Sequence, residues 1–174
     1  LKVYHDLDEY GIWYAILIVP VTLVLLDTYF FWIHYFMHHP RFAKKSNHRV
    51  HHLFKNVSPW SAFSVHPFEG LIEILSRPLL LMFIPLHPYS ILAFLLITFG
   101  LNVMGHSGYE FFPKNYPRIP LLNLGSCSTF HFLHHRDSCY NFSLFLNVWD
   151  RIMGTMHPDY EKFYDEVMAN REKR

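Results

Sequence analysis

Long apolar runs dominate the first hundred residues of the chain. Residues 12–33 carry one charged side chain, Asp27, and form a run long enough to cross a bilayer as a helix. Pro20 lies inside this run and is expected to kink the helix without ending it, as membrane helices tolerate. Residues 78–86 and 89–104 are two further apolar stretches joined by the sequence PLHP, and residues 71–75 extend the first one backward. The pattern therefore predicts one membrane-spanning helix followed by a helical hairpin.

Polar segments separate and follow these apolar runs. Residues 35–66 are rich in histidine and in basic side chains, so the positive-inside tendency places this loop in the cytoplasm. The hairpin leaves this side and returns to it, and a charged helical tail begins at Pro158. Most histidines are then expected on one membrane face, with His5 and His87 on the other.

Composition agrees with an integral membrane protein. The 174 residues suit a single domain over residues 1–174, and the chain is 51% hydrophobic and 17% charged. The predicted fold is an all-α membrane helical bundle with a cytoplasmic, histidine-rich cap. A net charge of +1 gives no indication of nucleic-acid binding, and two cysteines are too few for a four-thiolate zinc site or an iron–sulfur cluster. Because the first residue is Leu, we expect an N-terminally truncated sequence.

The fourteen histidines carry the candidate chemistry. The pattern H-x-x-H-H occurs twice, in NHRVHH at residues 47–52 and in HFLHH at residues 131–135. Positions i, i+3 and i+4 share one face of a helix, and His34/His38 and Asn102/His106 are further i, i+4 pairs. Imidazole is a good ligand for iron, zinc or copper, and this many imidazoles exceed what one ion can use. We therefore predict a two-metal centre with the ligands His34, His38, His48, His51, His52, His106, His131, His134 and His135.

Several neighbouring residues have more than one interpretation. His39 competes with His38 as the second histidine of the first motif, and the i, i+4 spacing favours His38. His66 is either a metal ligand, an orienting residue or a turn residue. Asp27 lies two turns before His34 and is either a catalytic second-shell group or part of an interhelical hydrogen bond. Asn102 is a candidate catalytic residue, a ligand or a contact between helices.

An ordered set of motifs identifies a resemblance to a known family. The segments DTYFFWIHYFMHHP, NHRVHH, SPWSAFSVHPFEG, NVMGH and HFLHH, followed by NFSLFLNVWDRIMGT, resemble the fatty acid hydroxylase/sterol desaturase superfamily. The similarity is greatest to its sterol desaturase-like branch and covers about residues 27–156.

The resemblance implies a non-haem di-iron oxidoreductase that uses O2. It would oxidise a C–H bond of a membrane lipid, most simply a sterol-like one, by hydroxylation or desaturation. Zinc could occupy the same ligands in a purified sample. The chain has no flavin, haem or ferredoxin motif, so a separate electron donor is expected, of the cytochrome b5 or ferredoxin type. The implied location is the endoplasmic reticulum membrane in a eukaryote or the inner membrane in a bacterium, with the site facing the cytoplasm.

Alternative functions stay open at this point. The lipid could be fatty acyl, sphingoid or carotenoid, and a non-enzymatic alternative is a membrane metal-binding or transport protein. The apolar part of a lipid would lie against aromatic and aliphatic residues of the spans, namely Phe30, Phe31, Phe94, Leu95 and Phe99. Asp150 and Arg151, in the NVWDRIMGT segment, are interpreted as a surface pair.

Overall fold

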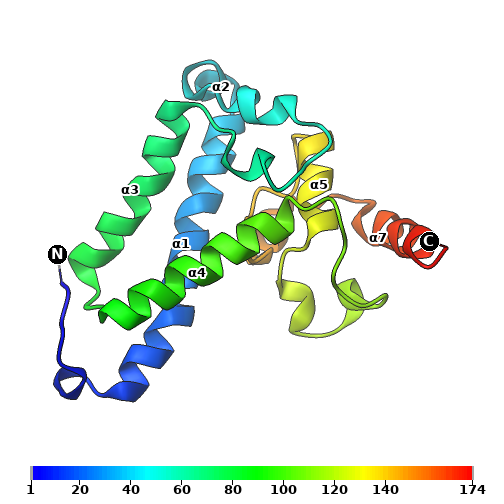
Figure 1. Cartoon of the computed structure of the whole chain (residues 1–174). Helices are drawn as coiled ribbons and strands as arrows, with labels where there is room; N and C mark the ends of the chain where they lie inside the picture. The colour runs from blue at the N-terminus through cyan, green and yellow to red at the C-terminus, as the bar shows by residue number, and fades with distance from the viewer. Residues whose placement is uncertain (1, 174) are drawn as a thin grey trace.

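The computed structural model describes residues 2–173, which are helical apart from turns, loops and isolated bridges such as Val3 with Leu86. Three long helices form one part of the molecule, and shorter helices form a cap beside their upper end (Figure 1). The all-α prediction is confirmed. The elements are η1 (Leu7–Glu9), α1 (Ile12–His38), α2 (Pro40–Ser46), η2 (His48–Leu53), η3 (Ser61–Phe63), α3 (Pro67–Phe83), α4 (Pro88–Gly105), η4 (Tyr116–Arg118), η5 (Leu122–Leu124), α5 (Ser128–Arg136), α6 (Val148–Met153) and α7 (Tyr160–Arg171).

Helix α1 is the predicted first span, and it runs five residues beyond the apolar stretch. It continues through Pro20 and ends at His38. The next residue, His39, is extended (φ −67°, ψ 134°), as expected for a residue that precedes proline. The last turns of α1 therefore carry His34 and His38 out of the apolar region and into the cap.

Helices α3 and α4 form the predicted hairpin. Each begins with a proline at its first position, where the missing N–H is not needed. The hairpin packs against α1, and the contact includes a hydrogen bond from the Ser90 hydroxyl to the Ala15 carbonyl at 2.7 Å. A buried apolar cluster joins α1, α4 and the segment after α5; it consists of Val19, Leu26, Phe94 and Phe145.

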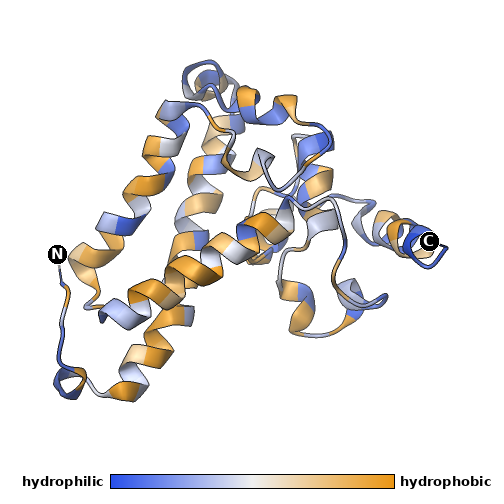
Figure 2. Ribbon diagram, in the orientation of Figure 1, coloured by the Kyte–Doolittle hydropathy of each residue, from blue (hydrophilic) through white to orange (hydrophobic). Residues whose placement is uncertain are grey.

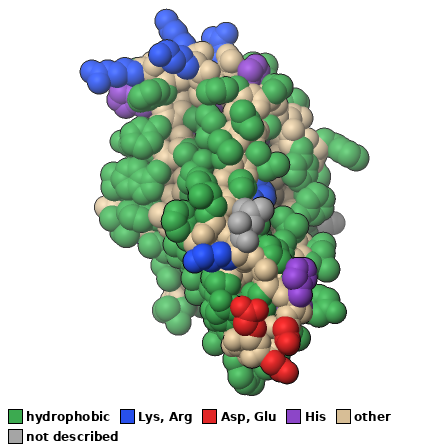
Figure 3. All heavy atoms as spheres, turned by 90° about the vertical axis from the view of Figure 1, so that its left-hand side faces the viewer, with side chains coloured by type: hydrophobic (Ala, Val, Ile, Leu, Met, Phe, Trp, Pro, Cys, Tyr) green, Lys and Arg blue, Asp and Glu red, His purple; other side chains and the backbone are tan. Residues whose placement is uncertain are grey.

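The surface of the long helices is apolar. Helices α1 and α4 are long and apolar enough to cross a membrane, and only 28% and 17% of their most apolar windows are buried inside the protein. Figure 2 shows hydrophobic residues along α1, α3 and α4, and Figure 3 shows that they cover most of one face, between a basic upper end and an acidic lower end. A soluble core helix would be mostly buried, so this pattern indicates a membrane protein. Crossing by α3 stays a prediction.

A separate core supports the cap. Helix α7, the predicted charged tail, packs against the buried face of α5. This core holds α5 in place, and α5 carries the second histidine triplet. Its buried members are Tyr116, Cys127, Phe130, Leu133, Tyr160, Tyr164 and Met168.

Candidate metal centre

Nine histidines from α1, η2, the C-cap of α4 and α5 meet in two groups. Figure 1 shows how these elements are arranged. These histidines are the nine predicted ligands. All are buried except His38, which is half-buried. Each offers one nitrogen, and the nitrogens form two groups in which all members lie within 4.8 Å of one another. Both groups could hold a metal ion.

The first group, called cluster one, joins five histidines: His34, His38, His48, His52 and His134. Their Nε2 atoms face one another, and the closest pairs are 2.9–3.2 Å apart. Nitrogens bound at about 2.1 Å to a common ion are about 3 Å apart when they are neighbours. The spacing therefore suits one shared ion.

The second group, called cluster two, joins four histidines: His51, His106, His131 and His135. The Nε2 atom of His131 lies 2.9 Å from that of His106 and 3.0 Å from that of His135. The His51 Nε2 atom is 3.5 Å from that of His106. The two clusters adjoin, because the rings of His52 and His135 have centroids 4.8 Å apart.

Each triplet contributes histidines to both clusters, so neither triplet forms a cluster of its own. The outer histidines of the first triplet, His48 and His52, join the middle histidine of the second, His134. The outer histidines of the second, His131 and His135, join His51. The first triplet is a 3₁₀-helix, in contrast to the α-helical face that the spacing predicts, and α5 carries the second.

The hydrogen bonds of the Nδ1 atoms test whether a metal suits these residues. A carbonyl oxygen only accepts, so an Nδ1 atom beside it must carry the proton and leave a lone pair on Nε2. His34 donates to the Phe142 carbonyl at 2.6 Å and His134 donates to the Tyr140 carbonyl at 2.7 Å. In cluster two, His106 donates to the Asn102 carbonyl at 2.9 Å. Lone pairs that converge without a proton between them form the donor set of a metal site.

Burial keeps these imidazoles neutral. Loss of hydration lowers the pKa of His51 to about 3 and that of His52 to about 2, and neighbouring imidazoles contribute to both shifts. Burial also holds the pKa values of His131 and His134 well below the usual range. The rings are therefore uncharged at neutral pH, which is the form that binds a metal ion.

Glu69 is a site residue to which the sequence analysis gave no role. Its side chain is fully buried in the first turn of α3, and one carboxylate oxygen pairs with Nδ1 of His48. The other oxygen has no hydrogen-bond partner among the described residues. A carboxylate behind a metal-binding histidine fixes its tautomer and raises its basicity. The HPFEG motif could have indicated this role, because it places an acid one turn into a helix beside the histidine-rich loop.

Two buried aspartates hold residues 142–146 against the site. Asp27 accepts hydrogen bonds from the backbone N–H groups of Leu144, Phe145 and Leu146, at 2.7–3.3 Å. Its contacts are those of a structural residue, and its predicted catalytic role stays a prediction.

Asp150 is the second of these aspartates. It accepts from the backbone of Phe142 and Ser143, both at 2.8 Å, and from the Thr155 hydroxyl. The interpretation of Asp150 and Arg151 as a surface pair is wrong. Asp150 is fully buried, and Arg151 donates to Asn147 and Asn123 instead. Since Phe142 is the carbonyl partner of His34, Asp150 supports cluster one.

Asn102 lies beside cluster two without joining it. Its side-chain amide nitrogen is 3.5 Å from the Ala62 carbonyl oxygen. Its backbone carbonyl accepts a hydrogen bond from Nδ1 of His106. The side chain lines the small cavity between the clusters. Its catalytic role stays a prediction as well.

Four of the five histidines outside the clusters share one local feature, which is a following proline; His5 is the exception. Both His39 and His66 precede a helix that begins with proline, and each accepts a hydrogen bond through Nδ1 from the backbone N–H two residues later. His87 and His157 do the same. The structure therefore shows His39 and His66 as capping residues outside both clusters, and it gives neither a place among the candidate ligands.

Two neighbouring cavities with shared lining residues lie beside the clusters. A small one of about 40 Å³ is lined by cluster histidines and by Glu69, and a larger one of about 260 Å³ lies between α1, α3 and α4. Phe30, Leu95 and Phe99 line the larger cavity, as predicted for a lipid-contacting surface. Phe31 and Phe94 belong instead to buried packing.

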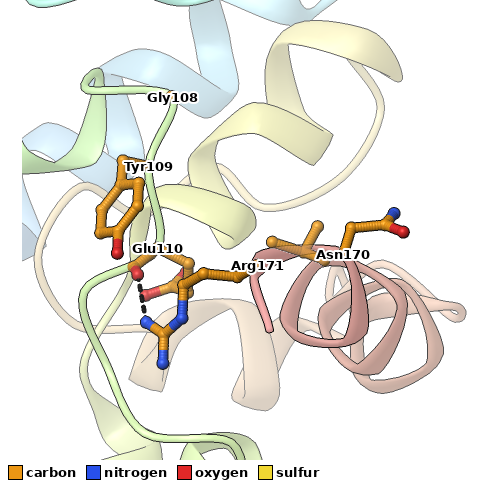
Figure 4. A pocket seen from close by; sticks show the side chains of 6 residues that line it. Gly108, Tyr109, Glu110, Asn170 and Arg171 are labelled. Atoms are coloured by element: carbon orange, nitrogen blue, oxygen red, sulfur yellow. Dashed lines mark hydrogen bonds between the residues drawn. The ribbon is translucent and has the colours of Figure 1, made fainter. Parts of the chain in front are cut away.

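A further cavity of about 390 Å³ lies beside α7, away from the metal-binding nitrogens (Figure 4). Its lining includes Glu110 and Arg171, and Arg171 donates to the Glu110 carbonyl at 2.6 Å. None of the clustered histidines lines it. It is therefore no part of the candidate centre.

Comparison with known proteins agrees with this geometry. A family model described as fatty acid hydroxylase matches residues 19–155, which include all nine clustered histidines. A probable Delta(7)-sterol 5(6)-desaturase of Neurospora crassa is 29% identical over 158 residues, covering 90% of this chain and 43% of that protein. Human lathosterol oxidase is 28% identical over 156 residues, covering 88% and 50%. A Delta(7)-sterol 5(6)-desaturase of Leptosphaeria maculans is 29% identical over 157 residues, covering 90% and 40%.

The chain thus spans half or less of the length of these relatives. No solved structure matches it.

Proposed function

Because the chain belongs to the fatty acid hydroxylase family, we propose that it oxidises a C–H bond of a membrane lipid with O2 at a pair of iron ions. The substrate is sterol-like, as the names of the relatives indicate. The product is an alcohol or a double bond.

One observation carries this proposal: nine histidine nitrogens converge in two adjoining groups at the end of apolar helices. The donor set contains imidazoles alone, whereas soluble four-helix di-iron sites use glutamates together with Glu-x-x-His motifs. Iron, when bound, supplies the reduction of O2 and the oxidation of the C–H bond.

The protein's own residues hold and shield this centre. The backbone carbonyls of Phe142 and Tyr140 orient the rings of His34 and His134, and Glu69 orients His48. Burial of the clusters limits the access of water. The larger cavity, lined by residues of α1, α3 and α4, would receive the apolar part of the lipid beside the small cavity between the clusters.

Membrane placement and electron supply complete the proposal. The protein is a multi-pass membrane protein whose centre faces the cytoplasm, in the endoplasmic reticulum of a eukaryote or in the inner membrane of a bacterium. A separate donor of the cytochrome b5 or ferredoxin type supplies two electrons. Exposed basic residues at the upper end, Arg41, Lys44 and Lys45, suit an acidic donor or anionic lipid headgroups.

The test is oxidation by the membrane-embedded protein together with its metal content. Isolated membranes receive a Delta(7)-sterol, a chemical or protein reductant and ¹⁸O₂, and products are identified by mass spectrometry. Replacing one ligand of each cluster, in His134→Ala and His51→Ala, is expected to remove about one ion per variant and to lower the rate at least ~100-fold. His87→Asn keeps a capping side chain at the far end of the hairpin and is the matched control.

Two results would contradict the proposal. One is full activity in either ligand variant with normal insertion. The other is stoichiometric metal with no reductant-dependent consumption of O2 on any sterol, acyl, sphingoid or carotenoid lipid, which would favour a metal-binding or transport protein.

A further inference from the structure

The larger cavity between α1, α3 and α4 adjoins the small cavity at the candidate metal centre. Four residues line both of them: Phe30, Glu73, Asn102 and Leu144. Clustered histidines line the small cavity and none of them lines the larger one. A molecule seated in the larger cavity can therefore place one end beside the centre.

The lining of this larger cavity is mainly apolar, and it also contains the neutral polar residues Thr98 and Asn102 and one pair of charged residues. Glu73 and Arg77 are the charged residues in it, and they lie one helical turn apart on α3. Both are half-buried, and among the described residues neither side chain makes a direct hydrogen bond or ion pair. Ionisable groups among apolar helices are costly when no partner satisfies them. An acceptor and a donor thus face a cavity with their hydrogen-bonding capacity unused.

We propose that Glu73 and Arg77 bind the hydroxyl group of a lipid alcohol, an inference that rests on the proposed function of the adjoining centre. A hydroxyl donates to a carboxylate and accepts from a guanidinium, so it satisfies both residues at once. A carboxylate accepts from Arg77 but has no proton to donate to Glu73, and an ammonium donates to Glu73 but has no acceptor for Arg77. A hydrocarbon would leave both side chains without a hydrogen-bond partner.

The position of Glu73 determines where the hydroxyl lies. Glu69 contacts His48, and Glu73 follows one turn later, a rise of about 6 Å along the helix. Glu73 also lines the small cavity together with the clustered histidines, so the hydroxyl lies on the side of the larger cavity that is nearer to the candidate centre. The apolar remainder of the lipid extends along Leu26, Leu95 and Phe99.

A binding measurement tests this inference without turnover. Purified protein in detergent binds dehydroergosterol, a fluorescent sterol alcohol, and binding is read by energy transfer from tryptophan. The competitors are 5α-cholestan-3β-ol, its 3-methyl ether, 5α-cholestane, palmitate and octadecylamine. The alcohol is expected to compete about tenfold or more better than the ether, because the ether cannot donate to Glu73.

Variants assign this preference to the two residues. Glu73→Met and Arg77→Met are each expected to reduce the difference between alcohol and ether to less than about threefold. Leu79→Met changes an exposed residue of the same helix outside the cavity and should keep the full difference. Metal content and a monodisperse elution profile show whether each variant is folded. The comparison of competitors on the unchanged protein stands even if a variant does not fold.

The outcomes separate this inference from the proposed function. Equal competition by alcohol, ether and alkane, or stronger competition by palmitate or octadecylamine, would overturn the role of Glu73 and Arg77, whatever the oxidation assay shows. Hydroxyl-dependent binding that both variants abolish would support it, even if no oxidised product is found. In that second case only the proposed oxidation would fail.

Discussion

At the scale of single residues, the residue that follows a histidine distinguishes capping histidines from candidate metal ligands. His39, His66 and His87 cap helices, because the proline that follows each of them begins the helix and leaves the preceding residue extended with its side chain free to accept an N–H. His157 also precedes a proline and accepts an N–H two residues later, but it lies in the turn before α7. The nine clustered histidines lack a following proline and end in Nε2 lone pairs that face one another. His5 belongs to neither set.

Glu69→Gln is predicted to weaken metal binding while preserving the shape of the side chain. A neutral amide is a weaker partner than a carboxylate for the Nδ1–H of His48, so the basicity of this ligand falls. The affinity of cluster one should decrease about 10–100-fold. Metal retained during titration with a chelator measures this change. Glu166→Gln in α7, an exposed position, is the control, and equal retention in the two variants would show that Glu69 does not support His48.

At the scale of elements, residues 142–146 join the spans to the cap. Asp27 of α1 accepts three backbone N–H groups from this segment, and Asp150 of α6 accepts two more. The same segment presents the Phe142 carbonyl to His34. A buried charged acceptor on each side thus fixes the position of the first ligand on α1.

Asp27→Asn is predicted to destabilise the protein by about 1–3 kcal/mol, because the amide NH₂ would face the N–H group of Leu146. Thermal unfolding in detergent should move to lower temperature, and cluster one should bind metal less tightly. The conservative variant Asp27→Glu keeps the charge and tests the geometry alone. Loss of turnover with unchanged metal content and unchanged unfolding would instead assign Asp27 a catalytic role.

At the scale of the whole molecule, the centre lies where separate segments meet, so metal and fold depend on each other. Cluster one takes ligands from α1, η2 and α5, and cluster two takes them from η2, α4 and α5. Without a cation, lone pairs about 3 Å apart repel one another. The cap therefore depends on the metal more than the long helices do.

Removal of the metal by a chelator is predicted to lower the stability of the cap. Ligand binding at about 1,000 times its Kd contributes about 4 kcal/mol to the native state. Hydrogen exchange should accelerate in η2 and α5 and stay unchanged in the middle of α1 and α4. Adding back iron or zinc should restore protection. Uniform acceleration along the chain, or none, would contradict this dependence.

The sequence by itself determined the helices and the identity of the clustered histidines. Apolar length predicts α1 and the hairpin, and the i, i+3 and i+4 spacing selects nine candidates, because both signals are local in the chain. The preference for His38 over His39 also follows from spacing, and the structure agrees with it.

Only the tertiary structure decided which histidines share a cluster. The triplets exchange their middle members, and Glu69, Asp27 and the Phe142 carbonyl become partners of residues far away in sequence. The face that a short helix turns toward its neighbours depends on its packing, and the first triplet forms a 3₁₀-helix whose periodicity differs from that of an α-helix. Contacts between distant segments produce no periodic pattern in the sequence. The spacing of the histidines therefore identified the candidate ligands but could not show which of them share a cluster.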